Sequence, residues 1–272
     1  MNCTAGQTYF VIPPSGKVWR CWAHQREAYG SVSDLTLRPK TSPCPEFRCR
    51  ACERQCNVIE YDDGVVRGFG SSRGPGHLVF RVMPVLSCNY DCPYCITETR
   101  NNRVFDVPKD EHRIIPASSW CTWWSFIKHR SERCDVYVSG GEPSTYPGFD
   151  EFIQAVDRMP GSHWLATNLS RPIPSLEEGL IKRFDIDASA HLTEPKFDPV
   201  AFLKRARTIA NHAPLRIKVI HGHAPAKELA EFQAAAAALK LRLTVTPDRQ
   251  DKRKTSPPLP TEVDQDSPAT SA

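Results

Sequence analysis

Three cysteines near the middle of the chain have the spacing that points most directly to chemistry. Cys88, Cys92 and Cys95 lie in the stretch "SCNYDCPYC" and form a C-x3-C-x2-C pattern. Three closely spaced thiolates suit a cuboidal 4Fe-4S cluster, in which one compact loop holds three of the irons. The fourth iron then lacks a protein ligand, and an open position is where a metal centre takes a substrate or a cofactor. The pattern therefore predicts a metal site with one open position.

A glycine-rich stretch, "SGGEPS", follows about 45 residues later and contains Gly140, Gly141, Glu142 and Pro143. Two glycines allow backbone to approach a bound molecule closely, because neither carries a Cβ. The carboxylate of Glu142 is a partner for a cationic group. This stretch is therefore predicted to bind part of a ligand.

Strand-like and helix-like stretches alternate from Leu78 onward. The strand-like stretches are residues 77–87, 134–141, 163–168, 184–190, 214–220 and 241–246, and each of the first five is followed by a helix-like stretch. Those helix-like stretches are residues 118–130, 149–159, 175–184, 199–212 and 226–240. This alternation predicts an α/β fold with a parallel sheet that curls into a partial (β/α)6 TIM-like barrel. Functional groups in such barrels lie at the carboxyl ends of the strands, where both motifs are expected.

With these residues in place, the sequence resembles the radical S-adenosylmethionine (radical SAM) enzymes, roughly over residues 78–248. That family has C-x3-C-x2-C after the first barrel strand and a GGEP-type motif after the second. The resemblance implies that Cys88, Cys92 and Cys95 are the catalytic cysteines and hold a 4Fe-4S cluster. It also implies that SAM chelates the open iron and is cleaved reductively to a 5′-deoxyadenosyl radical, which abstracts a substrate hydrogen.

The same resemblance implies the residues that bind the cofactor. Tyr94 would pack near the adenine, and the glycine-rich stretch would bind the methionyl amino group. Further contacts with the ribose or carboxylate would come from the ends of later strands. The implied set is Tyr94, Gly140, Gly141, Glu142, Pro143, Asn168, Ser189 and His191. The sixth strand-like stretch, "LRLTVTPD", departs from the family because it has no glycine-containing motif.

A cysteine-rich head precedes the barrel. Of the 11 cysteines, six lie in the first 56 residues: Cys3, Cys21, Cys44, Cys49, Cys52 and Cys56. The stretch "YFVIPPSGKVWRCW" predicts a hairpin with a Pro-Ser-Gly turn, and Gly16 to Cys21 reads G-x4-C. This head resembles the SPASM/Twitch auxiliary-cluster domain, although that domain usually follows the barrel and has seven cysteines. The resemblance implies one auxiliary 4Fe-4S cluster and leaves a second one open, while zinc is the alternative, because C-x2-C is also ordinary zinc spacing.

The chain is accordingly divided into three parts. Residues 1–73 form the SPASM/Twitch-like head, residues 74–248 form the barrel, and residues 249–272 form a tail. The joint at residues 71–77 is rich in glycine and proline. The tail has charge runs, prolines and few apolar residues, and is predicted to be disordered.

Composition excludes several classes of protein. Among 272 residues the formal charge is +4, too mild a surplus for a nucleic-acid-binding stripe, and no stretch approaches the ~20 apolar residues of a membrane span. The start lacks a secretory signal pattern, so we expect a cytoplasmic protein. Clustered cysteines in a reducing compartment favour metal or iron–sulfur ligation.

The expected partners are an external electron donor, such as a flavodoxin or ferredoxin, and a peptide or small-molecule substrate. Auxiliary-cluster enzymes of the family often modify peptides or proteins, which suggests an oxidoreductase of that kind. The alternative is a non-catalytic iron–sulfur or zinc protein on a degenerate barrel, an electron carrier or adaptor that would not bind SAM.

Overall fold

The computed structural model describes residues 9–21, 24–39, 58–60, 66–68, 76–92, 94–95, 113–221 and 224–247. Its strands are β1 (Tyr9–Ile12), β2 (Lys17–Cys21), β3 (His24–Ser31), β4 (Thr36–Leu37), β5 (Val58–Glu60), β6 (Val66–Gly68), β7 (His77–Val82), β8 (Arg133–Val138), β9 (His163–Thr167), β10 (Phe184–Ala190), β11 (Leu215–His221) and β12 (Leu243–Pro247). Its α-helices are α1 (Ala117–Lys128), α2 (Phe149–Asp157), α3 (Pro174–Glu177), α4 (Pro199–Ala210) and α5 (Ala226–Ala238).

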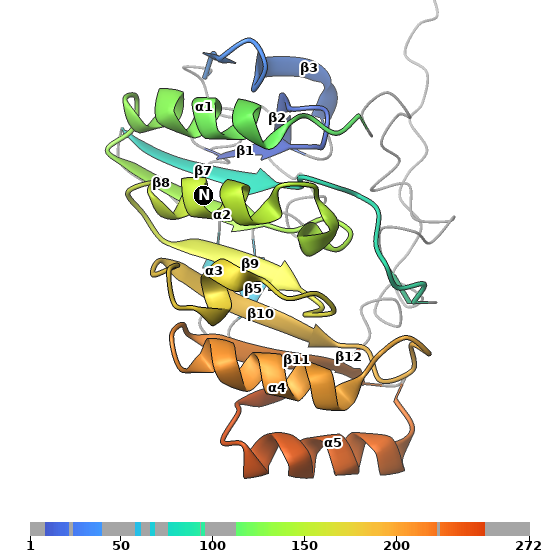
Figure 1. Cartoon of the computed structure of the whole chain (residues 1–272). Coiled ribbons are helices and arrows are strands. Elements are labelled where there is room, and N and C mark those ends of the chain that lie inside the picture. The colour runs from blue at the N-terminus through green and yellow to red at the C-terminus, as the bar shows by residue number, and fades with distance from the viewer. Residues whose placement is uncertain are drawn as a thin grey trace, which may run out of the picture.

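One sheet runs through the described part of the molecule, in the order β12-β11-β10-β9-β8-β7-β1-β2-β3-β4. Strands β7 to β12 are all parallel to their neighbours and lie in chain order. Helices α1 to α5 cover one face of this sheet (Figure 1). The predicted α/β fold with a parallel sheet is confirmed. The curvature of a partial barrel remains a prediction.

Helix α1 is anchored by three tryptophans on one side. Trp120, Trp123 and Trp124 are at most 1% exposed and recur at helical spacing, as the sequence predicts. The ring of Phe80 on β7 meets two of these indoles edge-on, with centroids 5.7 Å and 6.4 Å apart. Large aromatic side chains bury much apolar area and prefer such edge contacts. The packing therefore fixes α1 over β7, the strand that precedes the predicted cysteine motif.

The predicted hairpin is present, because β1 and β2 pair antiparallel. It does not form a separate sheet, since β1 also pairs with β7 in parallel register, Phe10 opposite Phe80. The β1 residues Tyr9–Ile12 are all buried, and a continuous apolar run of this kind is typical of a strand covered on both faces. The sheet thus continues across the boundary expected between residues 73 and 74.

Two local expectations were wrong. The helix expected over residues 175–184 is the short α3, which ends before Gly179, a residue with φ +68°. Glycine adopts this left-handed conformation without a Cβ clash and commonly ends helices. Ser118, at the start of the helix-like stretch 118–130, has a residue type that often caps helices, but α1 begins at Ala117 with Pro116 as N-cap and no side-chain cap.

No helix in the described residues is both long enough and apolar enough to cross a membrane. The five head cysteines other than Cys21 lie outside the described residues, as do residue 248 and the predicted tail, residues 249–272. Cys21 ends β2, but its side chain is not among those described. Strands β5 and β6 pair antiparallel as a second, two-stranded sheet.

A buried histidine makes the fold sensitive to acid. His163 on β9 is 1% exposed, packs against Phe184 with ring centroids 5.2 Å apart, and has Nε2 3.3 Å from the Met159 carbonyl oxygen. Burial lowers the pKa of His163 from 6.5 to about 4. The unfolded chain therefore binds a proton on this ring before the folded chain does.

Acidification from pH 6.5 to pH 4 should therefore weaken folding through His163. A group whose pKa is lowered by folding contributes its full stabilisation at pH values above its unfolded-state pKa. That stabilisation is lost as the pH falls toward its folded-state pKa. Between pH 6.5 and 4, His163 should account for up to about 3 kcal/mol of lost unfolding free energy. Denaturant unfolding of wild type and His163→Leu across this range should show a flatter pH dependence for the variant. Equal slopes would contradict this account.

Candidate functional site

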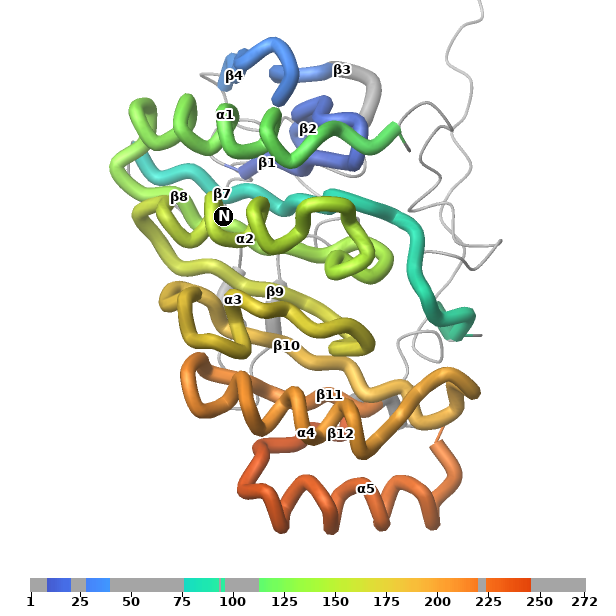
Figure 2. The backbone as a smooth tube through the Cα atoms, in the orientation of Figure 1, coloured from blue at the N-terminus to red at the C-terminus, as the bar shows by residue number. Residues whose placement is uncertain are grey.

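The cysteine loop (residues 83–92, 94 and 95) leaves the carboxyl end of β7 and runs along the carboxyl ends of β8 to β10. Figure 2 shows this segment extending from β7 toward the loop that follows β10. Hydrogen bonds from the two sides confirm the placement, since Glu142 N donates to Ser87 O (3.0 Å) and Asp91 N donates to a Glu194 carboxylate oxygen (2.9 Å). The predicted position of this motif at the carboxyl ends of the strands is therefore observed.

The two glycines after β8 pack directly on the backbone of the cysteine loop. Gly140 has φ +130°, and a Cβ there would overlap with the Val85 carbonyl oxygen. A Cβ on Gly141 would overlap with the carbonyl oxygen of Ser87, while Gly141 N donates to Val85 O at 3.2 Å. Only glycine permits this approach. The sequence predicted that these two glycines let the backbone approach a bound molecule closely. In the structure they approach the backbone of the cysteine loop.

Glu142 is buried, 1% exposed, and its carboxylate is held by four donors from this chain. One oxygen accepts Ser144 N (3.0 Å), Ser144 Oγ (2.6 Å) and Thr167 Oγ1 (2.7 Å), and the other accepts Asn168 N (2.6 Å). Burial raises the pKa of Glu142, and these hydrogen bonds oppose the increase. The carboxylate therefore ties the loop after β8 to the end of β9.

The loop after β10 holds the other side of the cysteine loop. His191 Nδ1 lies 3.2 Å from Cys92 Sγ and 3.0 Å from the Tyr94 hydroxyl oxygen, and the rings of His191 and Tyr94 stack at 5.9 Å. Burial lowers the pKa of His191 to about 4, so the imidazole is neutral at pH 7. His191 and Tyr94, both predicted cofactor contacts, are thus brought together against a predicted metal ligand.

Asn168 joins the end of β9 to the start of the cysteine motif. Its Nδ2 donates to Asn89 Oδ1 (3.1 Å) and lies 3.8 Å from Cys88 Sγ, and its Oδ1 accepts Ser170 N (2.9 Å). The predicted site residue Pro143 is buried and begins the 3-10 turn Pro143–Thr145. Ser189 lies on β10 opposite Lys218 of β11, on the face of the strand away from Ala188 and Ala190.

The three cysteines gather around two tyrosines. Cys92 packs with Tyr90 and Tyr94 in a small buried cluster, against which Cys88 and Cys95 also pack. Burial, together with the charge of Glu194 and the other two cysteines, raises the pKa of Cys92 to about 12, although a hydrogen bond with Tyr94 opposes this. A bound metal deprotonates its thiol ligands and supplies the missing positive charge. The donor set therefore fits a metal group.

No three His, Cys, Asp or Glu side chains in the described ranges are close enough together to hold a single metal ion. The three thiols accordingly do not form a preassembled one-ion site within that part of the chain. Cys121 and Cys134, which carry no motif, are a half-buried and a fully buried free thiol.

Sequence reasoning missed several residues that build the site. Thr167 and Ser144 hold Glu142, Asn89 pairs with Asn168, and Glu194 fixes Asp91. The sequence signal for Asn89 was its place inside the cysteine motif. Glu194 offered no comparable signal, because its role depends on a contact with a residue 103 positions earlier.

Comparisons with solved structures found likenesses at low identity. Streptococcus suis SuiB bound to precursor peptide SuiA is 18% identical over 65% of this chain and 40% of that chain, with a TM-score of 0.47. SuiB bound to S-adenosylmethionine gives 17% identity over 64% of this chain and 39% of that chain, with a TM-score of 0.44. The cobalamin-dependent S-adenosylmethionine radical enzyme OxsB gives 16% identity over 70% of this chain and 29% of that chain, with a TM-score of 0.30.

Both proteins are solved with S-adenosylmethionine bound. OxsB is described as a cobalamin-dependent S-adenosylmethionine radical enzyme. The chain spans less than half the length of either protein, and the TM-scores lie below 0.5. No family model matches the chain, and the search of curated proteins found no match.

Replacing Glu142 by glutamine should destabilise the site measurably. The new amide would direct an N–H group toward donors that now meet a carboxylate oxygen. Buried donors would then lack an acceptor, which should lower the unfolding free energy by about 1–3 kcal/mol. Denaturant unfolding should show this loss for Glu142→Gln, whereas Glu178→Gln, at an exposed position, should change unfolding by less than about 0.5 kcal/mol. Equal effects of the two substitutions would show that the Glu142 contacts contribute nothing specific.

Proposed function

We propose that this chain is a radical SAM enzyme whose 4Fe-4S cluster is held by Cys88, Cys92 and Cys95. The observation that carries the proposal is the packing of the cysteine loop on Gly140 and Gly141. The two motifs come from different parts of the sequence, 45 residues or more apart, yet their backbones touch at the carboxyl ends of β7 and β8. Binding sites of parallel α/β sheets are found at this edge.

The chemistry of the donor set supports the cluster. Cys88 and Cys95 are partly exposed and Cys92 is buried, so one loop offers three sulfurs with apolar cover from Tyr90 and Tyr94. Apolar cover limits the access of water and tunes an iron–sulfur group. When bound to the open iron and reduced, SAM would supply a 5′-deoxyadenosyl radical that abstracts a substrate hydrogen.

The protein's own residues would position the cofactor and exclude water. Gly140, Gly141, Glu142 and Pro143 would lie near the methionyl amino group, but the Glu142 carboxylate already accepts hydrogen bonds from Ser144, Thr167 and Asn168. Its part is therefore to hold the surrounding backbone in place. His191 and Tyr94 form a stacked pair that would line the cofactor site, with Asn168 and Ser189 at neighbouring strand ends.

The substrate would be a peptide or protein that undergoes modification, with a small molecule as the less favoured choice. This part of the proposal rests on the resemblance of the head to auxiliary-cluster domains. An external flavodoxin or ferredoxin would supply the electron, which makes the protein an oxidoreductase that works in the reducing cytoplasm.

The head would carry an auxiliary 4Fe-4S cluster on ligands drawn from Cys3, Cys21, Cys44, Cys49, Cys52 and Cys56. The described part of the head supports a close relation to the barrel, because β1 lies beside β7 in the same sheet. Truncating the head would remove the buried residues Phe10 and Ile12 from the core. Cysteine substitution is therefore the appropriate way to probe it.

The decisive experiment measures SAM cleavage by the full chain after anaerobic reconstitution with iron and sulfide. Wild type should release 5′-deoxyadenosine when reduced, and the triple variant Cys88→Ala, Cys92→Ala, Cys95→Ala should release none while losing about four irons per chain. Cys121→Ala is the matched control and should behave as wild type, because this cysteine lies on α1. Intact cleavage in the triple variant, or zinc in place of iron in wild type, would overturn the proposal.

The same iron measurement reports on the head. Relative to wild type, replacing the six head cysteines by serine should remove about four irons per chain if there is one auxiliary cluster and about eight if there are two. Unchanged iron in this variant would show that the head holds no cluster, without affecting the conclusion for Cys88, Cys92 and Cys95.

A further inference from the structure

Two of the three motif cysteines have side-chain nitrogens directed at their sulfurs. Asn168 Nδ2 lies 3.8 Å from Cys88 Sγ, and His191 Nδ1 lies 3.2 Å from Cys92 Sγ. The two nitrogens come from different strand ends, since Asn168 follows β9 and His191 follows β10. They lie 80 and 99 positions along the chain from the cysteines that they contact. The resemblance assigns both residues to SAM, whereas in the structure both reach the sulfurs.

The orientation of the Asn168 amide is fixed by its neighbours. Its Oδ1 accepts Ser170 N at 2.9 Å, and its Nδ2 donates to Asn89 Oδ1 at 3.1 Å. Because the amide oxygen must face the backbone N–H, the amide nitrogen faces the cysteine loop. The backbone is held as well, since Asn168 N donates to a Glu142 carboxylate oxygen at 2.6 Å. An amide nitrogen carries two N–H groups, so one serves Asn89 and the second is directed at Cys88 Sγ.

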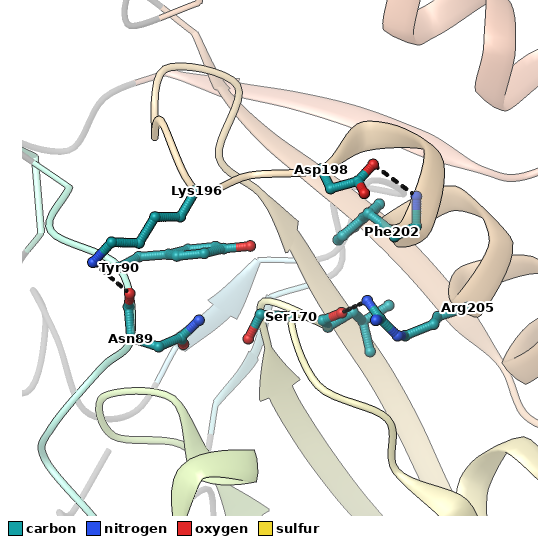
Figure 3. Close-up of a pocket in the computed structure, with 9 residues that line it drawn as sticks. Asn89, Tyr90, Ser170, Lys196, Asp198, Phe202 and Arg205 are labelled. Carbon is teal, nitrogen blue, oxygen red and sulfur yellow. Dashed lines mark hydrogen bonds between the residues drawn. The ribbon is translucent and has the colours of Figure 1, made fainter.

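The partner of Asn168 in the cysteine loop is itself held from two sides. A cavity of about 260 Å³ lies beside this loop, and Figure 3 shows Lys196 passing beside Tyr90 to reach Asn89 at its edge. Lys196 Nζ donates to Asn89 O at 3.4 Å, while the Asn89 side chain points toward the segment that follows β9. The residue next to Cys88 is therefore tied to the segments after both β9 and β10.

His191 is clamped between two tyrosine rings. It stacks on Tyr94 with ring centroids 5.9 Å apart and an interplanar angle of 5°, and it meets Tyr90 edge-on at 5.6 Å. Its Nδ1 lies 3.0 Å from the Tyr94 hydroxyl oxygen and 3.2 Å from Cys92 Sγ. A metal-bound sulfur carries no proton and can only accept a hydrogen bond. The tautomer that suits a metal-bound Cys92 therefore has its proton on Nδ1 and donates to the sulfur.

The charges beside the loop give such donors a task. The Glu194 carboxylate accepts Asp91 N at 2.9 Å and the Glu142 carboxylate accepts Asn168 N at 2.6 Å, while Lys196 offsets one of these two charges. Reduction of a cluster adds a negative charge, which a nearby carboxylate opposes. A hydrogen bond to a ligand sulfur has the opposite effect, because it stabilises the more negative form.

We propose that Asn168 and His191 are positioning residues that donate hydrogen bonds to the sulfurs of Cys88 and Cys92 and thereby raise the reduction potential of the cluster. They assist the entry of one electron from the external donor, a step in which no bond forms or breaks. The proposal rests on the proposed function, since it needs a cluster on these cysteines. It differs from the SAM contacts that the resemblance implies for the same two residues.

The test is a redox titration of the full chain, reconstituted anaerobically without SAM, with titanium(III) citrate as reductant and electron paramagnetic resonance as readout. The relevant signal is the one that the Cys88→Ala, Cys92→Ala, Cys95→Ala variant lacks. Asn168→Leu and His191→Phe should each lower the equilibrium constant for one-electron reduction about ten-fold, a shift of about 59 mV to more negative potential. Where either variant fails to take up iron, Asn168→Ala or His191→Leu removes the same donor and should give the same shift.

Two kinds of control separate the hydrogen bond from packing. His191→Asn keeps a donor nitrogen at the place of Nδ1 but loses the ring, and should retain the wild-type potential. Asn211→Leu and His212→Phe make the same substitutions at exposed positions after α4 and should also leave the potential unchanged. A potential for His191→Asn equal to that of His191→Phe would show that ring packing, not the donor, is what matters, and would overturn the proposal for His191.

Unchanged potentials in Asn168→Leu and His191→Phe would overturn the proposal as a whole. Calorimetric titration with SAM then identifies the alternative, because weaker SAM binding at an unchanged potential would assign both residues to the cofactor. If wild type cleaves SAM but the variants keep its potential, only this inference fails. If wild type holds no iron on Cys88, Cys92 and Cys95, the proposed function fails with it.

Discussion

The contact between the two glycines after β8 and the backbone that follows β7 is the constraint on which the site depends. Gly140 and Gly141 leave no room for a Cβ beside the carbonyl oxygens of Val85 and Ser87. Hydrogen bonds from Gly141 N and Glu142 N to the same backbone fix the two loops relative to each other. These backbone contacts define where the cysteine loop begins, and the side-chain contacts further along hold the rest of it.

Two further strands complete the support. The Glu142 carboxylate carries the constraint to Thr167 and Asn168 at the end of β9, and His191 and Glu194 hold the cysteine loop from beyond β10. These polar contacts lie at the carboxyl ends of the strands. The apolar packing of Phe80 with the tryptophans of α1 fixes strand β7. Stability and site formation therefore depend on different parts of the sheet. Apolar side chains provide stability on the helix-covered face, and polar groups shape the site at the strand ends. Acid sensitivity through His163 concerns stability, because that ring is buried near the amino end of β9.

Local sequence patterns predicted the parts of the structure that depend on local physics. The alternation of helix-like and strand-like stretches predicted α1, α2, α4 and α5, and β10 was predicted at its observed bounds. The cysteine spacing and the glycine pair marked the two loops that meet. The pairing of β1 with β7 was not predicted, since 65 or more residues separate the two strands in sequence and the cysteine pattern suggested an independent head. The hydrogen bond of Asp91 N to Glu194 likewise depends on how distant segments meet. In the case of α3, one glycine conformation outweighed the helical propensity of the residues that follow.

If glycine at position 141 sets the position of the cysteine loop for metal binding, Gly141→Ala and Gly161→Ala should differ in the iron that each chain retains after anaerobic reconstitution. Both added methyl groups would overlap with a backbone carbonyl oxygen, but Gly161 lies before β9 at the opposite edge of the sheet, against Cys134. The account predicts that Gly141→Ala loses about four irons relative to wild type, while Gly161→Ala retains them. Equal iron in the two variants would contradict it.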